Sequence, residues 1–152
     1  MEPTYAAVAR LVARYAEYLD TGDLEGMAAM FDHATFRSDL PDGVVVLTGA
    51  DEVLAAFRAS TQRDERGLLG TRHVTTNLVV DEGPEEDTAR ARSYFTVLQA
   101  RPGFPLQVVV AGGYRDEFRR VDGEWRFADR LVRLDLEGDL SRHLVGWTSS
   151  TG

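Results

Sequence analysis

The chain has 152 residues, which is the length of one domain with a core and room for a pocket. Its net charge of −8 argues against nucleic acid as a partner and gives no basic patch for a membrane surface. The absence of cysteine excludes disulfides, thiolate chemistry and sulfur-ligated zinc or iron, and the absence of lysine excludes a lysine Schiff base.

The N-terminal part of the chain predicts helices. Thr4 is placed to cap a helix whose apolar side chains recur at three- and four-residue spacing from Val8 onward, and Gly22 ends it. Asp23 is placed to cap a second, short helix over residues 24–31. The N-terminus leads into this polar helix pattern instead of an apolar signal core, and no apolar run is long enough for a membrane span. We therefore expect a cytoplasmic protein with no membrane partner.

Extended segments separated by turn residues come next. Residues 35–38 and 44–47 predict two short strands, and the Pro41-Asp42-Gly43 turn between them predicts a hairpin. A third helix is expected to open at Thr48 and to reach about Thr61. Four longer strands are then expected, with turn signals between them and an Asp-Gly hairpin signal before the last, over residues 71–80, 88–100, 106–119 and 125–136.

Helices first and an antiparallel meander afterwards is the layer pattern of an α+β fold. We predict N-terminal helices packed on a strongly curved, mostly antiparallel sheet, with a pocket where a straight helix and a curved sheet cannot meet. We expect one domain over residues 1–152, with a core over about 5–136 and a polar tail over 137–152. Within the tail we expect a short helix over 140–145 and a frayed end over 148–152.

The strand over 71–80 carries the most unusual pattern. A period of two places His73, Thr75 and Asn77 on one face, with apolar residues on the other. An imidazole, a hydroxyl and an amide are costly to bury without partners. This face therefore either meets water or lines a polar cavity.

The last two strands offer further candidates. Tyr114 and Asp116 are expected to share one face of their strand, and Trp125 and Asp129 one face of the next. An acid among apolar neighbours either points into a pocket or pairs with an arginine, so Asp129 is a second carboxylate candidate. Trp125 is expected in the core or in the wall of a pocket that suits a flat hydrophobic ligand.

Several segments together resemble the SnoaL-like, NTF2-like superfamily. They are the helix pair around residues 15–27, the histidine strand at 71–77, and the segments 93–95, 113–116 and 123–127, so that the likeness spans about residues 5–136. The resemblance implies an NTF2-like cone that encloses a pocket, and a homodimer, because this fold usually pairs with a copy of itself. The superfamily holds dehydratases, isomerases, cyclases, epoxide hydrolases, dioxygenase small subunits and binding proteins.

Within the superfamily, the motifs look most like scytalone dehydratase and related polyketide cyclases. The family's paired aspartate and histidine match Asp20 and His73. The resemblance implies a cofactor-free enzyme that dehydrates, cyclises or isomerises a polycyclic aromatic or polyketide-like intermediate in natural-product biosynthesis, including antibiotic biosynthesis. His73 is then the general acid and base, and Asp20 orients its ring. No metal is expected, because the three histidines lack ligand spacing.

The residues expected to bind the hydrophobic substrate are drawn from several elements: Tyr15, Tyr18, Asn77, Tyr94, Tyr114, Trp125 and Asp129. The chain departs from the dehydratase pattern at two places. Leu19 stands where the dehydratase has a tyrosine before the aspartate, so Tyr15 or Tyr18 is the candidate substitute. No histidine occurs on the strand after His73, so the role of the dehydratase's second histidine is empty or passes to Tyr94. We expect His33 and His143 to be uninvolved.

Other interpretations stay open. His73 can be a core histidine satisfied by a backbone carbonyl, Asp20 can simply end its helix, and Asn77 can close a hydrogen bond across the sheet. At the level of function, the alternatives are a non-catalytic small-molecule-binding protein and the small subunit of a ring-hydroxylating oxygenase. A monooxygenase-like role in the same pathways is a third possibility.

Overall fold

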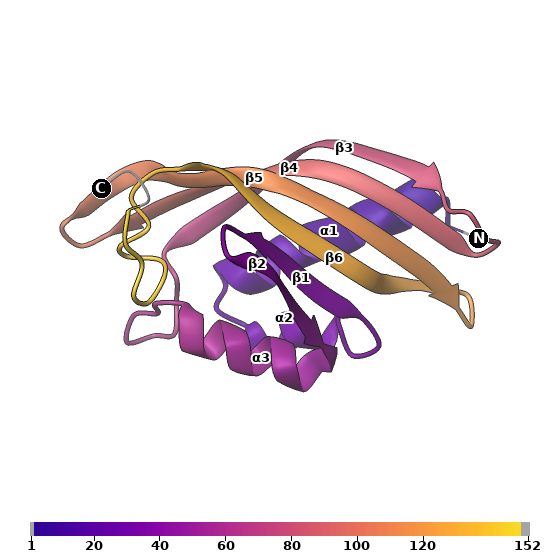
Figure 1. The fold of residues 1–152 in the computed structure, drawn as a ribbon, viewed down its shortest axis with the longest axis horizontal. Helices are drawn as coiled ribbons and strands as arrows, with labels where there is room; N and C mark the ends of the chain where they lie inside the picture. Colours follow the sequence, from indigo (N-terminus) through magenta and orange to yellow (C-terminus); the bar gives the residue numbers. More distant parts are fainter. Residues whose placement is uncertain (1, 150–152) are drawn as a thin grey trace.

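A computed structural model describes residues 2–149. Within them the elements follow the order α1 (Thr4–Asp20), α2 (Leu24–Ala29), β1 (Thr35–Leu40), β2 (Gly43–Thr48), α3 (Gly49–Ser60), β3 (Thr71–Glu82), β4 (Thr88–Arg101), β5 (Phe104–Val121) and β6 (Glu124–Glu137) (Figure 1). The predicted α+β class is confirmed. None of the helices in this part of the chain combines the length and the apolarity needed to cross a bilayer.

The strands form one sheet in the order β2-β1-β6-β5-β4-β3. All neighbouring pairs are antiparallel except β1 and β6, which run parallel, so the prediction of a mostly antiparallel sheet is confirmed. The long strands β3 to β6 twist across the molecule, and α1 lies along one of their faces (Figure 1). β1 and β2, at one edge of this sheet, and α3 lie on the same side of the long strands as α1 (Figure 1).

Helix α1 owes its position to one apolar stripe. Val8, Val12, Tyr15 and Leu19 are all buried, and their three- and four-residue spacing puts them on the side that meets the sheet. The predicted cap at Thr4 is wrong: Pro3 occupies the N-cap position, and no side chain caps this helix. The predicted cap of α2 is confirmed, because the Asp23 side chain accepts a 2.8 Å hydrogen bond from the Gly26 N–H.

The sheet contains several bulges, and two of them change which way the predicted site residues point. In β3, the pairing with β4 jumps between Thr76 and Val79, and Asn77 between them has a φ of 56°. In β6, Phe127 and Asp129 pair with consecutive residues of β5, so that Ala128 is the extra residue. Each insertion reverses the inward and outward alternation beyond it, because side chains on a strand have a period of two.

The C-terminal segment after β6 closes one end of the molecule, where it descends toward the end of α3 (Figure 1). Leu144 forms an isolated bridge with Thr61, and the Gln62 side chain donates to the Leu144 carbonyl at 2.9 Å. The predicted helix over 140–145 is wrong, because the segment forms turns around this bridge. Of the predicted frayed end, residues 150–152 lie outside the described part of the chain.

Candidate functional site

A cavity of about 380 Å³ lies between α1, the β1–β2 hairpin, α3, the sheet and the C-terminal segment. Most of its lining is apolar, with aromatic rings from Phe36, Phe57 and Phe95. A small set of polar side chains joins them: Tyr15, Ser38, Ser60, Thr61, His73, Tyr114 and His143. A volume of this size, an apolar wall and a few polar groups are the usual features of a small-molecule site.

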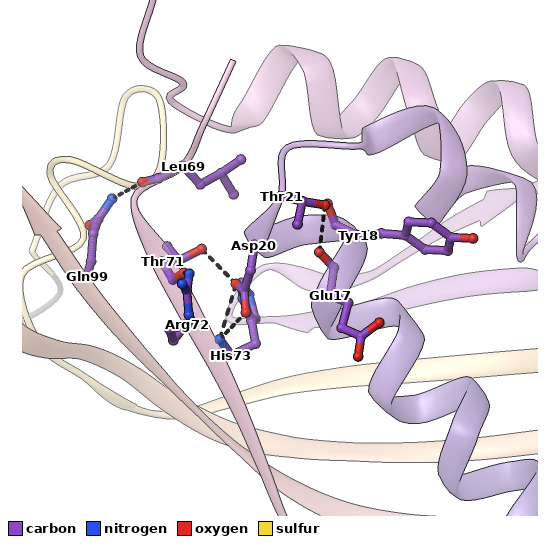
Figure 2. Close-up of polar contacts among 9 residues, drawn as sticks. All are labelled: Glu17, Tyr18, Asp20, Thr21, Leu69, Thr71, Arg72, His73 and Gln99. Carbon is purple, nitrogen blue, oxygen red and sulfur yellow. Dashed lines mark hydrogen bonds and ion pairs between the residues drawn. The ribbon is translucent and has the colours of Figure 1, made fainter. Parts of the chain in front are cut away.

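His73 and Asp20 meet at the edge of this cavity. The Nδ1 atom of His73 lies 2.6 Å from Oδ1 of Asp20, and the two side chains are only 7% and 11% exposed. The Asp20 carboxylate also accepts a 2.9 Å hydrogen bond from the His73 backbone N–H and a 2.9 Å bond from the Thr71 hydroxyl (Figure 2). An ionised carboxylate can only accept, so the proton of a neutral His73 ring lies on Nδ1 and Nε2 is free to act as a base.

The electrostatics keep Asp20 ionised. Burial raises the pKa of its carboxyl, but the hydrogen bonds and charge of His73, together with the Thr71 hydroxyl, outweigh burial and hold the pKa below the ordinary 3.8. The position alone is unfavourable for an acid, because Asp20 is the last residue of α1, where the helix dipole is negative. The three donors from β3 compensate for this position.

The chain turn after Asp20 fixes where this carboxylate points. Gly22 has a φ of 76°, and a Cβ there would collide with the carbonyl of Gly67. Only glycine fits this close approach of two backbones without strain. The turn therefore brings the segment before β3 against the end of α1, and His73 follows on that strand.

Residue His143 is the part of the site that the sequence did not predict. Its ring lines the cavity, and its centroid lies 6.2 Å from that of His73. The ring is buried, and Nδ1 has no hydrogen-bond partner among residues 2–149. Burial, aided by the charges of His73 and Arg101, lowers the pKa of His143 to about 4. His143 is therefore a neutral imidazole beside His73 at neutral pH.

The backbone before His143 is held from the sheet. The fully buried Gln99 side chain on β4 donates to the carbonyls of Leu69 and Arg142, at 2.9 and 3.0 Å (Figure 2 shows the bond to Leu69). The only sequence signal for this placement is the one-turn spacing of Leu140, His143 and Leu144 in an otherwise polar tail. The Gln99 side chain that holds the Arg142 carbonyl is more than 40 residues away in sequence, so no local pattern could identify this contact.

Tyr15 and Tyr114, both predicted to bind the substrate, line the cavity. Each is only 4% exposed, and their rings meet edge to face with centroids 5.9 Å apart. Burial raises the pKa of Tyr15 to about 12, against the opposing charge of Arg130, and raises the pKa of Tyr114 well above 10. Both phenols therefore keep their protons, and the Tyr15 hydroxyl lies within hydrogen-bond reach of Arg130 and of Tyr114.

Two predicted substrate-binding residues point to the opposite face of the sheet, and the bulges are the reason. Asn77 is exposed and lies with Tyr94 in a separate groove outside the cavity, so the prediction that it shares a face with His73 is wrong. Asp129 pairs with Arg37 through 2.7 and 2.8 Å hydrogen bonds on that outer face. Of the two alternatives for Asp129, pairing with an arginine is the one observed.

Three further predicted residues also lie outside the cavity. Tyr94 is 56% exposed on the outer face, so it cannot replace a second histidine. Tyr18 packs against the core, and its ring points away from His73 and Asp20 (Figure 2). Trp125 lies at the start of β6, with the Arg120 guanidinium over its ring. The β5–β6 turn is at the end of the sheet opposite the C-terminal segment (Figure 1). Within residues 2–149, no three His, Cys, Asp or Glu side chains gather as metal ligands.

The family model for the SnoaL-like domain matches residues 3–131. The chain belongs to the SnoaL-like domain family. Its solved neighbours include an NTF2-like protein with a cystatin-like fold and a second protein with a cystatin-like fold, which confirms the predicted fold. A comparison with curated protein sequences found no match.

Three solved structures place this SnoaL-like chain among its neighbours. A protein of unknown function from Mycobacterium tuberculosis is 29% identical, with 86% of this chain and 71% of that one covered and a TM-score of 0.67. A candidate scytalone dehydratase from Novosphingobium aromaticivorans is 26% identical, with 89% and 86% covered and a TM-score of 0.69. The β subunit of a candidate aromatic-ring-hydroxylating dioxygenase from the same species is 21% identical, with 88% and 90% covered and a TM-score of 0.70, which shows the fold alone.

Proposed function

We propose that this SnoaL-like protein is an acid–base enzyme that dehydrates, cyclises or isomerises a polycyclic aromatic or polyketide-like carbonyl compound. The observation that carries the proposal is the 2.6 Å contact between His73 and Asp20 at the wall of an apolar cavity. A buried His–Asp pair next to a ligand-sized cavity is an arrangement suited to general acid–base catalysis. Proton transfer by these side chains requires no cofactor.

The proposed reaction begins when Nε2 of His73 takes a proton from the carbon next to a carbonyl. The electron pair moves onto the carbonyl oxygen as an enolate, and Asp20 stabilises the imidazolium that forms. In a dehydration, the enolate re-forms the carbonyl and expels a β-hydroxyl, which takes the proton from His73 and leaves as water. In an isomerisation the proton returns to another carbon, and in a cyclisation it goes to the oxygen of the carbonyl that the enolate carbon has attacked. Such positioned proton transfer contributes about 10²–10⁴-fold to the rate.

Other residues at the cavity support the same chemistry. Tyr15 and Tyr114 are protonated phenols that can donate to the substrate oxygen as negative charge builds up on it. His143 faces His73 as a neutral ring, so it does not repel the imidazolium. The apolar wall and the volume of about 380 Å³ suit a flat aromatic substrate. We also propose a homodimer in solution, which light scattering of the purified protein tests.

The test is turnover by His73→Gln against a panel of aromatic polyketide intermediates, followed by mass spectrometry. We expect turnover to fall at least about 10²-fold while ligand affinity stays within about threefold, because the ring supplies the proton and not most of the contact area. His33→Gln is the matched control, because His33 lies on the surface with its side chain 70% exposed. Unchanged turnover in His73→Gln contradicts the proposal.

A second candidate function is non-catalytic support of an oxygenase. The fold-level likeness to a dioxygenase β subunit favours it. This candidate predicts that the purified chain converts none of the panel and copurifies with a larger, iron-containing subunit. The oxygenase-support candidate gives the proton on His73 no role. The His73→Gln variant therefore separates the two candidate functions.

A further inference from the structure

A buried ion pair lies directly behind the two cavity tyrosines. Arg130 on β6 and Asp116 on β5 are both fully buried at the side chain. They form two parallel hydrogen bonds, from Nε to Oδ1 at 2.8 Å and from Nη2 to Oδ2 at 3.0 Å. Placing two charges in the core costs more desolvation than most such pairs recover, so stability alone does not explain this one.

The guanidinium is surrounded by aromatic rings. Its Cζ atom lies 3.7 Å from the ring centroid of Tyr114, 4.3 Å from that of Tyr15 and 4.9 Å from that of Phe127. The rings of Tyr15 and Tyr114 therefore separate Arg130 from the cavity that both of them line. A cation against the face of a ring holds the ring in place, and it makes the O–H of a phenol a better donor.

One nitrogen of this arginine is unused by the protein. Nη1 is buried and has no hydrogen-bond partner within residues 2–149. A buried, charged donor without a partner is costly, because it has lost water and gained nothing in return. The Arg130 charge is therefore only partly compensated by Asp116, and the excess positive potential acts on the two phenols that face the cavity.

We propose that Arg130 is a positioning residue that makes Tyr15 and Tyr114 a binding site for an anionic oxygen of the ligand. The proposal deepens the function proposed above, in which that oxygen belongs to an enolate. Arg130 does not touch the ligand. Its charge orients and polarises the two hydrogen-bonded phenols, and this pair donates to the oxygen. Asp116 holds the guanidinium flat against the rings and reduces its net charge.

The test measures ligand binding without any turnover. The probe is para-nitrophenol at a pH where it is fully ionised, and nitrobenzene is a neutral probe of almost the same shape. Each affinity is measured for the wild type and for Arg130→Met/Asp116→Leu, which removes both charges and leaves neither partner alone. We expect the double variant to bind the phenolate about tenfold more weakly and nitrobenzene within about twofold. The matched control is Arg133→Met/Asp135→Leu, which removes an exposed pair of the same strand.

A single substitution gives a readout that a merely structural role cannot produce. Asp116→Asn keeps the shape of the side chain and leaves the Arg130 charge less compensated, so we expect it to bind the phenolate several-fold more tightly. Looser binding of both probes points to a structural role and overturns the proposal. Unchanged phenolate affinity in a folded double variant also overturns it, as does a wild type that binds the phenolate no better than nitrobenzene. None of these results depends on turnover, so failure of this proposal and failure of the proposed enzyme are separate observations.

Discussion

Replacing Asp20 by asparagine is the most direct test of the His73–Asp20 pair. The carboxylate accepts from the His73 ring, the His73 backbone N–H and the Thr71 hydroxyl. An asparagine offers one oxygen to these donors, and its NH₂ group favours the ring form that carries its proton on Nε2. That form cannot act as the base. We therefore expect kcat to fall by about 10²–10⁴-fold with a smaller change in KM.

The same substitution affects stability by an amount that can be worked out from the contacts. Loss of one charge-assisted hydrogen bond costs about 1.5–3 kcal/mol. For a chain of this length, that lowers Tm by roughly 3–12 °C. Because the pKa of Asp20 lies below its ordinary 3.8 in the folded protein, its stabilising effect is complete above that pH. The difference between wild type and variant should then shrink as the pH falls below about 3.8.

The assay combines single-turnover kinetics with thermal unfolding followed by circular dichroism. Asp32→Asn is the matched control, because Asp32 pairs with His33 at 3.6 Å on the surface and both side chains are about 70% exposed. An exposed pair contributes at most about 1 kcal/mol, so this control should keep both Tm and rate. A folded Asp20→Asn protein with wild-type kcat would refute the assignment of His73 as the base that Asp20 orients.

Three further predictions follow from buried groups. Asp116→Leu alone should lower the free energy of unfolding by about 3–5 kcal/mol in urea, because Arg130 loses its partner. Arg130→Met/Asp116→Leu should leave that free energy nearly unchanged. Equal losses of stability in the two variants contradict this prediction. The pKa of His143 falls from 6.5 to about 4 on folding, so the unfolded chain binds its proton first and stability drops as the pH falls through this range. His143→Phe should abolish up to about 3 kcal/mol of this acid sensitivity, and an unchanged pH dependence argues against the buried neutral ring. Burial raises the pKa of Tyr15 to about 12, so this phenol keeps its proton across the range in which the enzyme is assayed. Tyr15→Phe should therefore lower kcat but leave the shape of the plot of rate against pH unchanged between about pH 6 and about pH 10.

Local sequence patterns predict most of the helices and strands, and together with the family resemblance they predict the Asp20–His73 pair of the site. The apolar spacing from Val8 to Leu19 predicts α1 and its buried side, and Asp23 correctly predicts the start of α2. The turn at residues 41–43 predicts the β1–β2 hairpin, whose register ends with Leu40 opposite Gly43. These features depend on residues within a few positions of each other, which is why the sequence alone specifies them.

Which face of the sheet each side chain points to is harder to predict from sequence. Side chains alternate between the two faces only where the hydrogen-bond pairing of the strands has no bulge. One extra residue near Asn77 and another at Ala128 reversed the inward face, and they moved Asn77 and Asp129 to the outer surface. A bulge depends on the neighbouring strand as much as on its own residues. The resemblance favours Tyr18 as a substitute for the dehydratase tyrosine, and residue type favours Trp125 for the core or the pocket wall. Neither argument says which part of the core an aromatic side chain fills.

The sequence by itself determined the α+β order, the apolar faces and the two residues, Asp20 and His73, that resemble a catalytic pair. Only the tertiary structure decided that His143 returns from the C-terminal segment to lie 6.2 Å from His73, and that Arg130 lies behind the cavity tyrosines. The physical reason is the range of the interactions. Helices and turns form through neighbours along the chain, whereas a buried charge or a buried imidazole is positioned by the packing of elements far apart in sequence.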